Sequence, residues 1–219
     1  MKFAAVESAT EWCSAALWLD GELLAVEERA GQRHGELLLP MLDGLLARAG
    51  IRAADLEAVA FGAGPGAFTG LRIACGAAQG LAFARGLPVC GVSTLEAMAE
   101  ESGAPRVVAC LDARMGEVYY SALEMRDGRW REVVPARCVA PAQAPRPPGA
   151  GWIGVGSGFA AYGALGLAAV YPDVHPGAAA VARLAAPRLA AGEGVDAARA
   201  VPVYLRDRVA LTTEERRNR

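Results

Sequence analysis

One stretch of the chain limits the fold more than any other: a glycine-rich turn that leads directly into a helix of small residues, at 61–85 (FGAGPGAFTGLRIACGAAQGLAFAR). The preceding run from Leu56 to Gly62 is short and apolar, as in a buried strand. Gly64, Pro65 and Gly66 then supply the unusual backbone dihedrals of a tight strand-to-helix connection. We therefore expect a strand, a tight turn and a helix from Thr69 to Arg85, with Thr69 as its N-cap.

The predicted helix has almost no polar face. Arg72 and Gln79 are its only polar side chains between residues 71 and 84. Gly76 and Gly80 lie in one row at i, i+4 spacing, and each interior glycine costs a helix about 1 kcal/mol relative to alanine. Close packing must offset that cost, so the glycine row predicts a surface that another backbone approaches closely.

A glycine-rich turn before a helix can also hold a phosphate, because N–H groups at a helix N-terminus attract anions. The P-loop pattern, however, needs a Lys-Ser/Thr pair after its last glycine, and here Leu71 and Arg72 follow Gly70. The G-x-G-x-x-G spacing of dinucleotide sites is also absent. The pattern favours a structural turn that aims the helix, and it leaves a direct phosphate contact as the alternative.

Composition excludes several other classes of protein. A net charge of −2 argues against a broad basic surface for nucleic acid, so any such role must be shared with a partner.

The five cysteines form no C-x-x-C pair, and His34 and His175 lack the spacing of a metal-binding helix, so we expect buried thiols and no metal site. The absence of a signal region and of a long apolar run predicts a cytoplasmic protein with no membrane contact.

The helical period between His34 and Ala49 is unusually apolar. Six side chains share one side of this predicted helix: Leu37, Leu38, Met41, Leu42, Leu45 and Leu46. Leu39 widens the apolar arc beyond what is needed to cover one face of a sheet. The excess predicts a second packing partner, while Pro40 predicts either a kink or a later start of the helix.

The order of elements repeats along the chain. Three antiparallel strands are predicted first, at 2–7, 13–20 and 22–29, and three more at 106–112, 117–124 and 129–134. Each set is followed by alternating helix and strand patterns, with a helix capped by Ser93, another at 176–191 and a last short strand at 201–205. A charged, solvated tail is expected from Arg206.

Two such β-β-β-α-β-α halves are the pattern of the α/β actin-like, Hsp70-like (ASKHA) superfold, whose halves are ribonuclease H-like. We expect an N-terminal subdomain at 1–103 that carries the docking helices and a smaller, degenerate C-terminal subdomain at 104–219. Glu7 and Asp112 end the first strand of each half. In the superfold the corresponding acids face a nucleotide and its Mg²⁺ across a cleft; the alternative is that both are ordinary carboxylates at strand ends.

The chain also resembles one family specifically. The segments VESATEWCSAALW, HGELLLPML, GPGAFTGLRIACGAAQGLAFARGLPVCGVSTLEAMA, LDARMGEVYYSAL and PVYLRD are similar to those of the bacterial TsaB (YeaZ) family, and together they run from end to end of the sequence. The resemblance implies an actin-like fold and an inactive relative of TsaD. It also implies that TsaD and TsaE are partners in making threonylcarbamoyladenosine beside the anticodon of tRNAs that read codons beginning with A.

The resemblance and the apolar helices together give two sets of candidate residues. The expected partner interface consists of His34, Leu37, Leu38, Met41, Leu45, Arg72, Gly76, Gln79, Gly80 and Phe83. The expected vestigial nucleotide site consists of Glu7, Thr10, Gly64, Gly66 and Asp112. Glu7 stands where the family usually has aspartate and Ala67 where it usually has serine, and both departures weaken the case for nucleotide binding.

We therefore expect a non-catalytic subunit that binds TsaD, pairs with a second copy of itself when TsaD is absent, and meets tRNA only through the complex. The resemblance implies that the transferred threonylcarbamoyl group arrives as an adenylate from a separate enzyme, and that ATP and Mg²⁺ are used through the partners, with no cofactor bound tightly here. TsaD-type catalysis uses a metal held by paired histidines, and only His34 lies in the comparable helix. The alternative is an autonomous actin-like ATPase or a glycoprotease-type peptidase.

Overall fold

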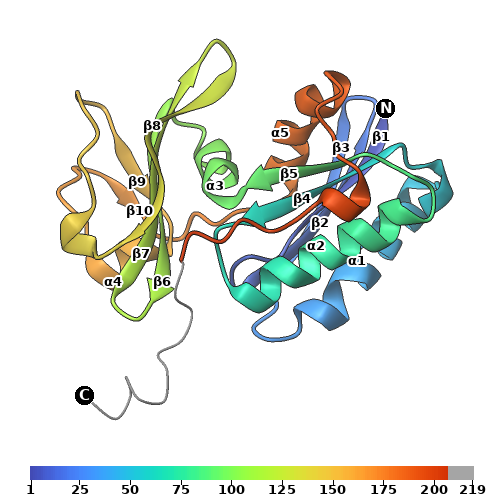
Figure 1. The fold of residues 1–219 in the computed structure, drawn as a ribbon, viewed down its shortest axis with the longest axis horizontal. Coiled ribbons are helices and arrows are strands. Elements are labelled where there is room, and N and C mark those ends of the chain that lie inside the picture. Colours follow the sequence, from blue (N-terminus) through green and yellow to red (C-terminus); the bar gives the residue numbers. More distant parts are fainter. Residues whose placement is uncertain (207–219) are drawn as a thin grey trace.

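The computed structural model describes residues 1–206, which form two lobes, each built on one five-stranded sheet (Figure 1). The first sheet has the order β3-β2-β1-β4-β5, with strands β1 (Lys2–Glu7), β2 (Trp12–Leu19), β3 (Glu22–Arg29), β4 (Ala58–Gly64) and β5 (Val89–Ser93). The second has the order β10-β9-β6-β7-β8, with strands β6 (Arg106–Arg114), β7 (Glu117–Arg126), β8 (Arg129–Val139), β9 (Ile153–Val155) and β10 (Val170–Tyr171).

The two sheets have the same topology. β1 is antiparallel to β2 and parallel to β4, and β6 is antiparallel to β7 and parallel to β9. Each half thus begins with a three-stranded meander and returns to its first strand by a crossover, which is the repeat that the sequence predicts. The expected α/β actin-like superfold, with its two ribonuclease H-like halves, is confirmed.

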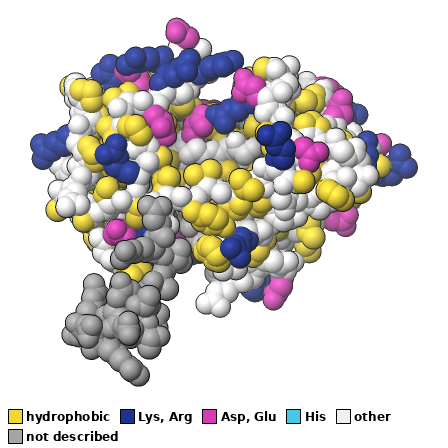
Figure 2. Space-filling model, in the orientation of Figure 1, with side chains coloured by type: hydrophobic (Ala, Val, Ile, Leu, Met, Phe, Trp, Pro, Cys, Tyr) yellow, Lys and Arg dark blue, Asp and Glu magenta, His cyan; other side chains and the backbone are white. Residues whose placement is uncertain are grey.

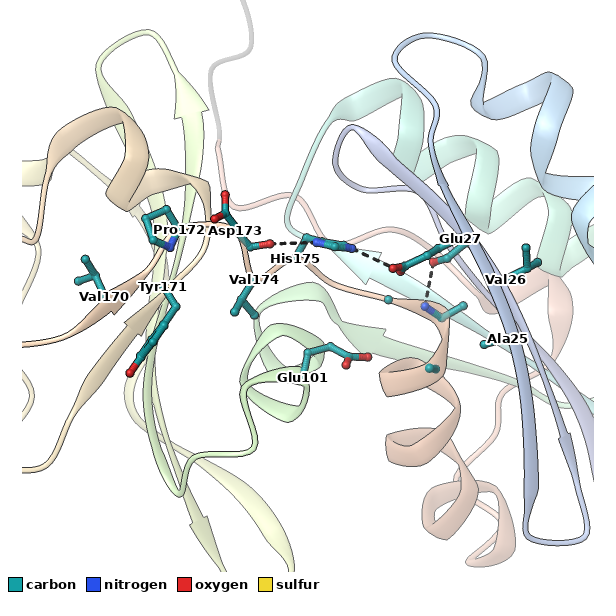
Figure 3. A pocket seen from close by; sticks show the side chains of 14 residues that line it. Ala25, Val26, Glu27, Glu101, Val170, Tyr171, Pro172, Asp173, Val174 and His175 are labelled. Atoms are coloured by element: carbon teal, nitrogen blue, oxygen red, sulfur yellow. Dashed lines mark hydrogen bonds and ion pairs between the residues drawn. The ribbon is translucent and has the colours of Figure 1, made fainter.

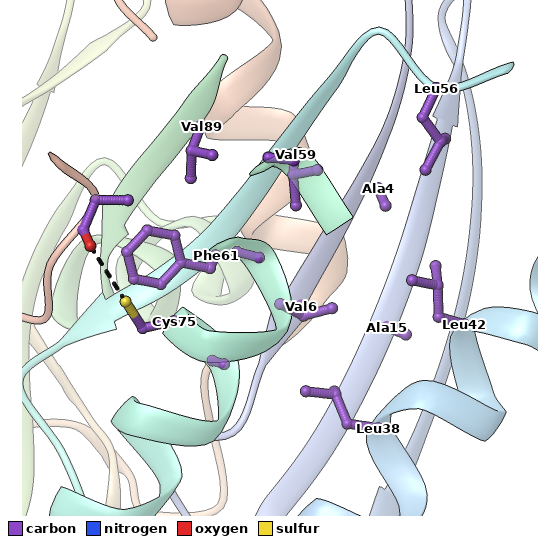
Figure 4. Packing of buried hydrophobic residues seen from close by; sticks show 14 of the residues in the cluster. Ala4, Val6, Ala15, Leu38, Leu42, Leu56, Val59, Phe61, Cys75 and Val89 are labelled. Atoms are coloured by element: carbon purple, nitrogen blue, oxygen red, sulfur yellow. Dashed lines mark hydrogen bonds between the residues drawn. The ribbon is translucent and has the colours of Figure 1, made fainter. Parts of the chain in front are cut away.

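Helices fill the space around the sheets. They are α1 (His34–Ala49), α2 (Phe68–Phe83), α3 (Thr94–Ser102), α4 (Ser157–Tyr162) and α5 (Ala178–Ala190), with short 3₁₀ turns η1 (Ala53–Asp55), η2 (Pro141–Gln143) and η3 (Ala197–Arg199). The helices α1 and α2 cover one face of the first sheet, where Leu38 and Cys75 point towards Val6 and Phe61 (Figure 4). Because Phe3 and Ala5 alternate with Val6 along β1, they face the opposite side and pack against α5.

The position of α5 alters the expected domain division. Although it follows the strands of the second half in sequence, its buried residues, such as Val181 and Leu189, pack against Phe3 and Ala5 of the first sheet. In exchange α3 places Leu95 and Met98 against β6 of the second sheet. A boundary at 103/104 therefore separates the two sheets but not the helices that cover them.

Most predicted elements occur close to their expected positions. α1 spans the predicted residues, His34–Ala49, and continues through Pro40, so the alternative of a later start is wrong. β8, predicted at 129–134, extends to Val139. Thr69 is not the N-cap of α2, because the helix starts one residue earlier and its cap is Ala67, whose N–H donates to the Ala9 carbonyl at 2.8 Å. The last strand, predicted at 201–205, is absent: the segment is extended, with one backbone bond from Val203 to Ala63. The solvated tail, predicted from Arg206 onwards, lies outside the described residues except for Arg206.

Two glycines of α2 serve different purposes. A Cβ at Gly70 would lie 1.9 Å from the carbonyl oxygen of Ser8, so only glycine lets the loop between β1 and β2 pack against the helix. A Cβ at Gly76 would meet nothing within 4 Å. The first glycine is thus needed for the fold of the chain itself, and the second is not.

We expect Gly70→Ala to lower the free energy of unfolding by about 2–4 kcal/mol, because a backbone atom must move to admit the methyl group. Gly76→Ala is the matched control in the same helix, and it should raise stability by about 0.5–1 kcal/mol through helix propensity alone. Urea unfolding followed by circular dichroism measures both values. Equal effects of the two substitutions would contradict this assignment of the close contact.

Candidate functional site

The carboxylate of Glu7 lies inside the protein rather than at the surface of a cleft. Its side chain is 1% exposed, and Oε1 accepts a hydrogen bond from the Ala9 N–H at 2.6 Å. Its Oε2 has no hydrogen-bond partner among residues 1–206. This oxygen would lie 1.8 Å from a Cβ at position 62, so the Glu7 side chain fits there only because residue 62 is glycine. Burial raises the pKa of this carboxyl from 4.5 to about 7.

The glycine-rich turn is occupied by the chain's own backbone. The Ser8 hydroxyl donates to the Gly70 carbonyl at 2.8 Å, and the Ala67 N–H donates to the Ala9 carbonyl. A Cβ at Gly66 would lie 2.5 Å from that same Ala9 oxygen. The close approach that these glycines allow is therefore used by the loop between β1 and β2, and the turn is structural, as the sequence pattern favours.

Asp112, the acid of the second half, is engaged by its own hairpin and by α4. Its Oδ1 accepts hydrogen bonds from the Arg114 N–H at 2.8 Å and from the Tyr162 hydroxyl at 3.3 Å, and its Oδ2 lies 3.2 Å from the Arg114 guanidinium. Thr10 is likewise engaged locally: its hydroxyl accepts from the Trp12 N–H and its carbonyl contacts His34 Nε2. Both residues are thus engaged by neighbouring groups of the chain.

The last described segment of the chain contacts both lobes. The segment 200–206, which we call the strap, leaves η3 beside α2 and crosses to the second lobe (Figure 1). The Val203 N–H donates to the Ala63 carbonyl at 2.7 Å, and the Val203 carbonyl oxygen would lie 2.7 Å from a Cβ at Gly64. At its far end Arg206 donates to the Arg114 carbonyl and pairs with Glu117 at 2.6 Å.

These observations test whether a nucleotide with Mg²⁺ fits the five residues expected to hold it. The first acid is buried, the second is paired with Arg114, and the strap lies between the glycine-rich turn and the hairpin that follows Asp112. The residues present therefore do not fit that group, and we derive no chemistry through it.

The expected partner interface divides into buried and exposed residues. Leu38 and Leu45 are each 1% exposed and belong to the core of the first lobe, and His34 is buried with Nε2 bonded to the Thr10 carbonyl. These three side chains face the sheet, so the expectation that they contact a partner directly is wrong. The sequence pattern correctly indicated the apolar side of α1. The sheet covers the middle of that side, so only residues at its edges stay accessible to a partner.

Arg72 and Gln79 hold the strap rather than stand free. The Arg72 guanidinium lies 3.9 Å from the centre of the Phe68 ring, and its Nε donates to the Tyr204 hydroxyl at 3.2 Å. The Gln79 amide donates to the Ala200 carbonyl at 2.9 Å. Arg72 and Gln79 thus hold the strap against α2, a role that no local pattern in the sequence indicates.

The remaining predicted residues lie at the surface. Gly76, Gly80 and Phe83 are exposed, Phe83 to 72%, and Leu37 and Met41 are half-buried beside them on α1. We call the outer surface of these two helices the α1–α2 face. Five more exposed apolar residues extend it: Leu39, which already widened the apolar arc of the predicted helix, and Phe68, Val201, Val203 and Tyr204. Hydrophobic side chains gather near the middle of the molecule, over the first turns of α2 and the strap (Figure 2).

A cavity of about 860 Å³ lies between the two lobes and is lined by strands β2 and β3, the end of α3, the segment 170–175 and the start of α5 (Figure 3). His175 crosses it, stacked on Trp12 at 4.2 Å and 3.4 Å from Glu27. The N–H groups of Ala178 and Ala180 at the start of α5 already donate to Ser14 and Glu101. With these helix donors taken and acidic side chains on its wall, the cavity does not favour an anion.

The described residues contain no group of three or more metal-ligating side chains that could hold an ion. Among those same residues, no helix is both long and apolar enough to cross a membrane.

Comparison with known proteins decides the family. The family model of TsaD, tRNA N6-adenosine threonylcarbamoyltransferase, matches residues 26–212. The tRNA threonylcarbamoyladenosine biosynthesis protein TsaB of Escherichia coli is 39% identical over 223 residues, which cover 96% of each chain. This chain belongs to the TsaB family.

Other relatives agree with that assignment. TsaB of Haemophilus influenzae is 42% identical over 152 residues, or 64% of each chain. The solved structure of YeaZ from Pseudomonas aeruginosa is 40% identical and superposes with a TM-score of 0.89 over 93% of this chain and 99% of its own. The TsaB (YeaZ) resemblance that the sequence motifs indicate is confirmed.

Because its pKa is raised on folding, Glu7 makes the free energy of unfolding fall as the pH rises. The unfolded chain releases this proton near pH 4.5, whereas the folded chain keeps it to about pH 7. Between those values the folded state binds more protons, so the contribution of Glu7 is complete below pH 4.5 and is lost as the pH rises to 7. We expect Glu7→Gln to be up to about 3 kcal/mol more stable than the parent at pH 8 and equal to it near pH 4.

Urea unfolding of both proteins at pH 4, 6 and 8 measures that difference. Glu22→Gln, which changes an exposed carboxylate on β3, is the control for a change of net charge. A gap between Glu7→Gln and the parent that stays constant with pH would show that the buried carboxyl does not titrate as described.

Proposed function

We propose that this chain is a non-catalytic subunit in tRNA threonylcarbamoyladenosine biosynthesis, and that it acts by binding TsaD through its α1–α2 face. Its TsaB relatives are named for that pathway, and the TsaD family model matches most of the chain. The transfer of threonylcarbamoyl from its adenylate to the adenosine beside the anticodon then takes place on TsaD, with TsaE as a further member of the complex. The pathway reaction implies a cytoplasmic location.

The observation that carries the docking proposal is the glycine row of α2. A Cβ at Gly76 or Gly80 would meet nothing within 4 Å, so nothing in the described chain uses the space that these glycines leave. Two helix-interior glycines cost about 2 kcal/mol relative to alanine. A partner backbone that approaches the helix closely would offset that cost.

The size of the surface agrees with such a contact. Two neighbouring helices of 16 residues span about 24 Å each. Together with the exposed apolar side chains of the strap, they offer an area approaching the ~800 Å² per partner of a standard interface. A second copy of the chain would use the same face when TsaD is absent, because bare apolar patches of this size favour association.

The environment of the two acids and the path of the strap support a non-catalytic role. Glu7 is buried, Asp112 is paired, and the strap lies across the region where the superfold binds its nucleotide. We therefore propose that no cofactor binds tightly to this chain, and that ATP and Mg²⁺ enter the reaction through its partners. The alternative of an autonomous ATPase or peptidase finds no nucleophile, base and metal arrangement among the described residues.

Gly80→Arg tests the docking face. Because no atom lies within 4 Å of the added Cβ, the variant should fold normally, but a bulky charge on the glycine row should abolish both TsaD binding and self-association. Size-exclusion chromatography with light scattering measures self-association, and calorimetric titration with purified TsaD measures the complex.

Ala190→Arg is the matched control for that variant. It adds the same charge to an exposed position on α5, which covers the opposite face of the first sheet. The control should bind TsaD as the parent does. A folded Gly80→Arg protein with unchanged affinity for TsaD would place the interface elsewhere.

The purified chain alone is expected to hydrolyse neither ATP nor a peptide substrate, because its two acids are buried or paired. Steady-state phosphate release and cleavage of a casein substrate measure the two activities. Asp112→Asn, which keeps the shape of the residue, identifies a contaminant: an activity that persists in this variant does not belong to the chain. Turnover that disappears in Asp112→Asn would refute the proposal of a non-catalytic subunit.

A further inference from the structure

Charge is distributed unevenly between the two lobes. Residues 1–103 carry seven basic and thirteen acidic side chains, whereas residues 104–172 carry seven basic and five acidic ones. The overall net charge of −2 therefore conceals a segment, residues 104–172, that is basic on balance and contains all the strands of the second sheet. Dark-blue side chains gather along the upper edge of the molecule, over the part of the ribbon where the β7–β8 hairpin stands (Figures 1 and 2).

Strand register places the arginines of this hairpin on one face. Arg106 pairs with Glu124, which in turn pairs with Arg131, so these three residues form one row across β6, β7 and β8. Arg126 pairs with Arg129 in a row two residues further along β7. Because residues directly opposite each other share a face, and alternate residues of a strand do too, all five side chains point the same way. We call them the arginine face.

Only part of this positive charge is neutralised within the chain. Glu124 is 8% exposed and pairs with Arg106 at 2.7 Å and with Arg126, and hydrogen bonds from these two arginines lower its pKa. Arg129 and Arg131 are exposed and form no ion pair within residues 1–206. Four arginines thus share this face with a single acidic residue, Glu124, which contacts two of them.

The arrangement is unfavourable for an isolated protein. Like charges directly opposite each other in an antiparallel pair destabilise the sheet, and Arg126 faces Arg129 in this way. The nearest other acids are Asp127 in the hairpin turn and Glu132, which pairs with the core residue Leu123 and so lies on the opposite face. A ligand that presents several negative charges would relieve the repulsion.

We propose that the arginine face binds the phosphate backbone of tRNA when the chain is part of its complex with TsaD. Guanidinium groups bind phosphate through paired hydrogen bonds, and a row of them matches a polyanion rather than a single ion. The hairpin stands away from α1 and α2 in Figure 1, so docking on the α1–α2 face leaves it uncovered. This inference rests on the proposed function, which brings tRNA to the complex.

The proposal agrees with weak binding by the chain alone. Few phosphate contacts on a chain of net negative charge give low affinity, and the contacts become effective when TsaD holds the same tRNA. We therefore expect no nanomolar binding of unmodified tRNA by the purified chain at physiological salt.

The test compares tRNA binding by the reconstituted complex with the parent chain, with Arg129→Gln/Arg131→Gln, and with Arg29→Gln/Arg52→Gln. The last double variant removes the same charge from exposed ion pairs on the first lobe. The probe is an unmodified transcript of a tRNA that reads codons beginning with A, and affinity is measured between 50 and 300 mM salt.

The arginine-face variant should bind about tenfold more weakly at ~0.1 M salt, and the slope of log K against log salt should fall by about 1–2. The control should match the parent. Binding to TsaD, measured separately, should be unchanged in both variants, which separates this proposal from the docking proposal. Equal affinity and equal slope for the two double variants would overturn it.

If the chain does not join TsaD, the proposed function fails, and the arginine face is then tested on the chain alone at 20 mM salt. Loss of the weak tRNA binding only in Arg129→Gln/Arg131→Gln supports the assignment. Equal binding by all three proteins refutes it, and an acidic protein that binds the parent but not this variant would identify a different partner for the face.

Discussion

The contact between the loop after β1 and the start of α2 is the constraint on which the rest of the structure depends. Ser8 and Ala9 lie so close to Gly66 and Gly70 that no larger residue fits at either glycine. This contact fixes where α2 begins and how it crosses the first sheet. It also draws Glu7 into the interior, because the same loop covers the end of β1.

One consequence is a superfold whose usual binding region is filled by its own chain. The loop after β1 occupies the glycine-rich turn, Arg114 neutralises Asp112, and the strap crosses from Ala63 to Glu117. Interactions that would hold a ligand in a related fold here join the two lobes to each other. The α1–α2 face and the arginine face are the outer surfaces for which we propose macromolecular partners.

The strap connects the α1–α2 face to the second lobe. Its Ala200 and Tyr204 are held by Gln79 and Arg72 of α2, and its apolar side chains extend the exposed surface of that helix. A partner on the α1–α2 face would therefore touch residues that are far apart in sequence. The same segment reaches the second lobe through Arg206, so a partner docked on the α1–α2 face would contact a segment that also joins the two lobes.

The sequence by itself determined the repeated topology, because alternation in the strands, the period of α1 and the Asp-Gly turns are local patterns set by neighbouring residues. It also favoured a structural role for the glycine-rich turn. That another backbone packs on Gly76 and Gly80 stays a prediction, because no atom of the described chain lies within 4 Å of a Cβ at either position. Only the tertiary structure decided that Leu38, Leu45 and His34 are buried, because an apolar pattern does not say how much of a helix one sheet covers. Three further features depend on contacts between distant segments: the position of α5, the path of the strap, and the common face of the arginines. A local sequence pattern cannot predict which distant segments come into contact.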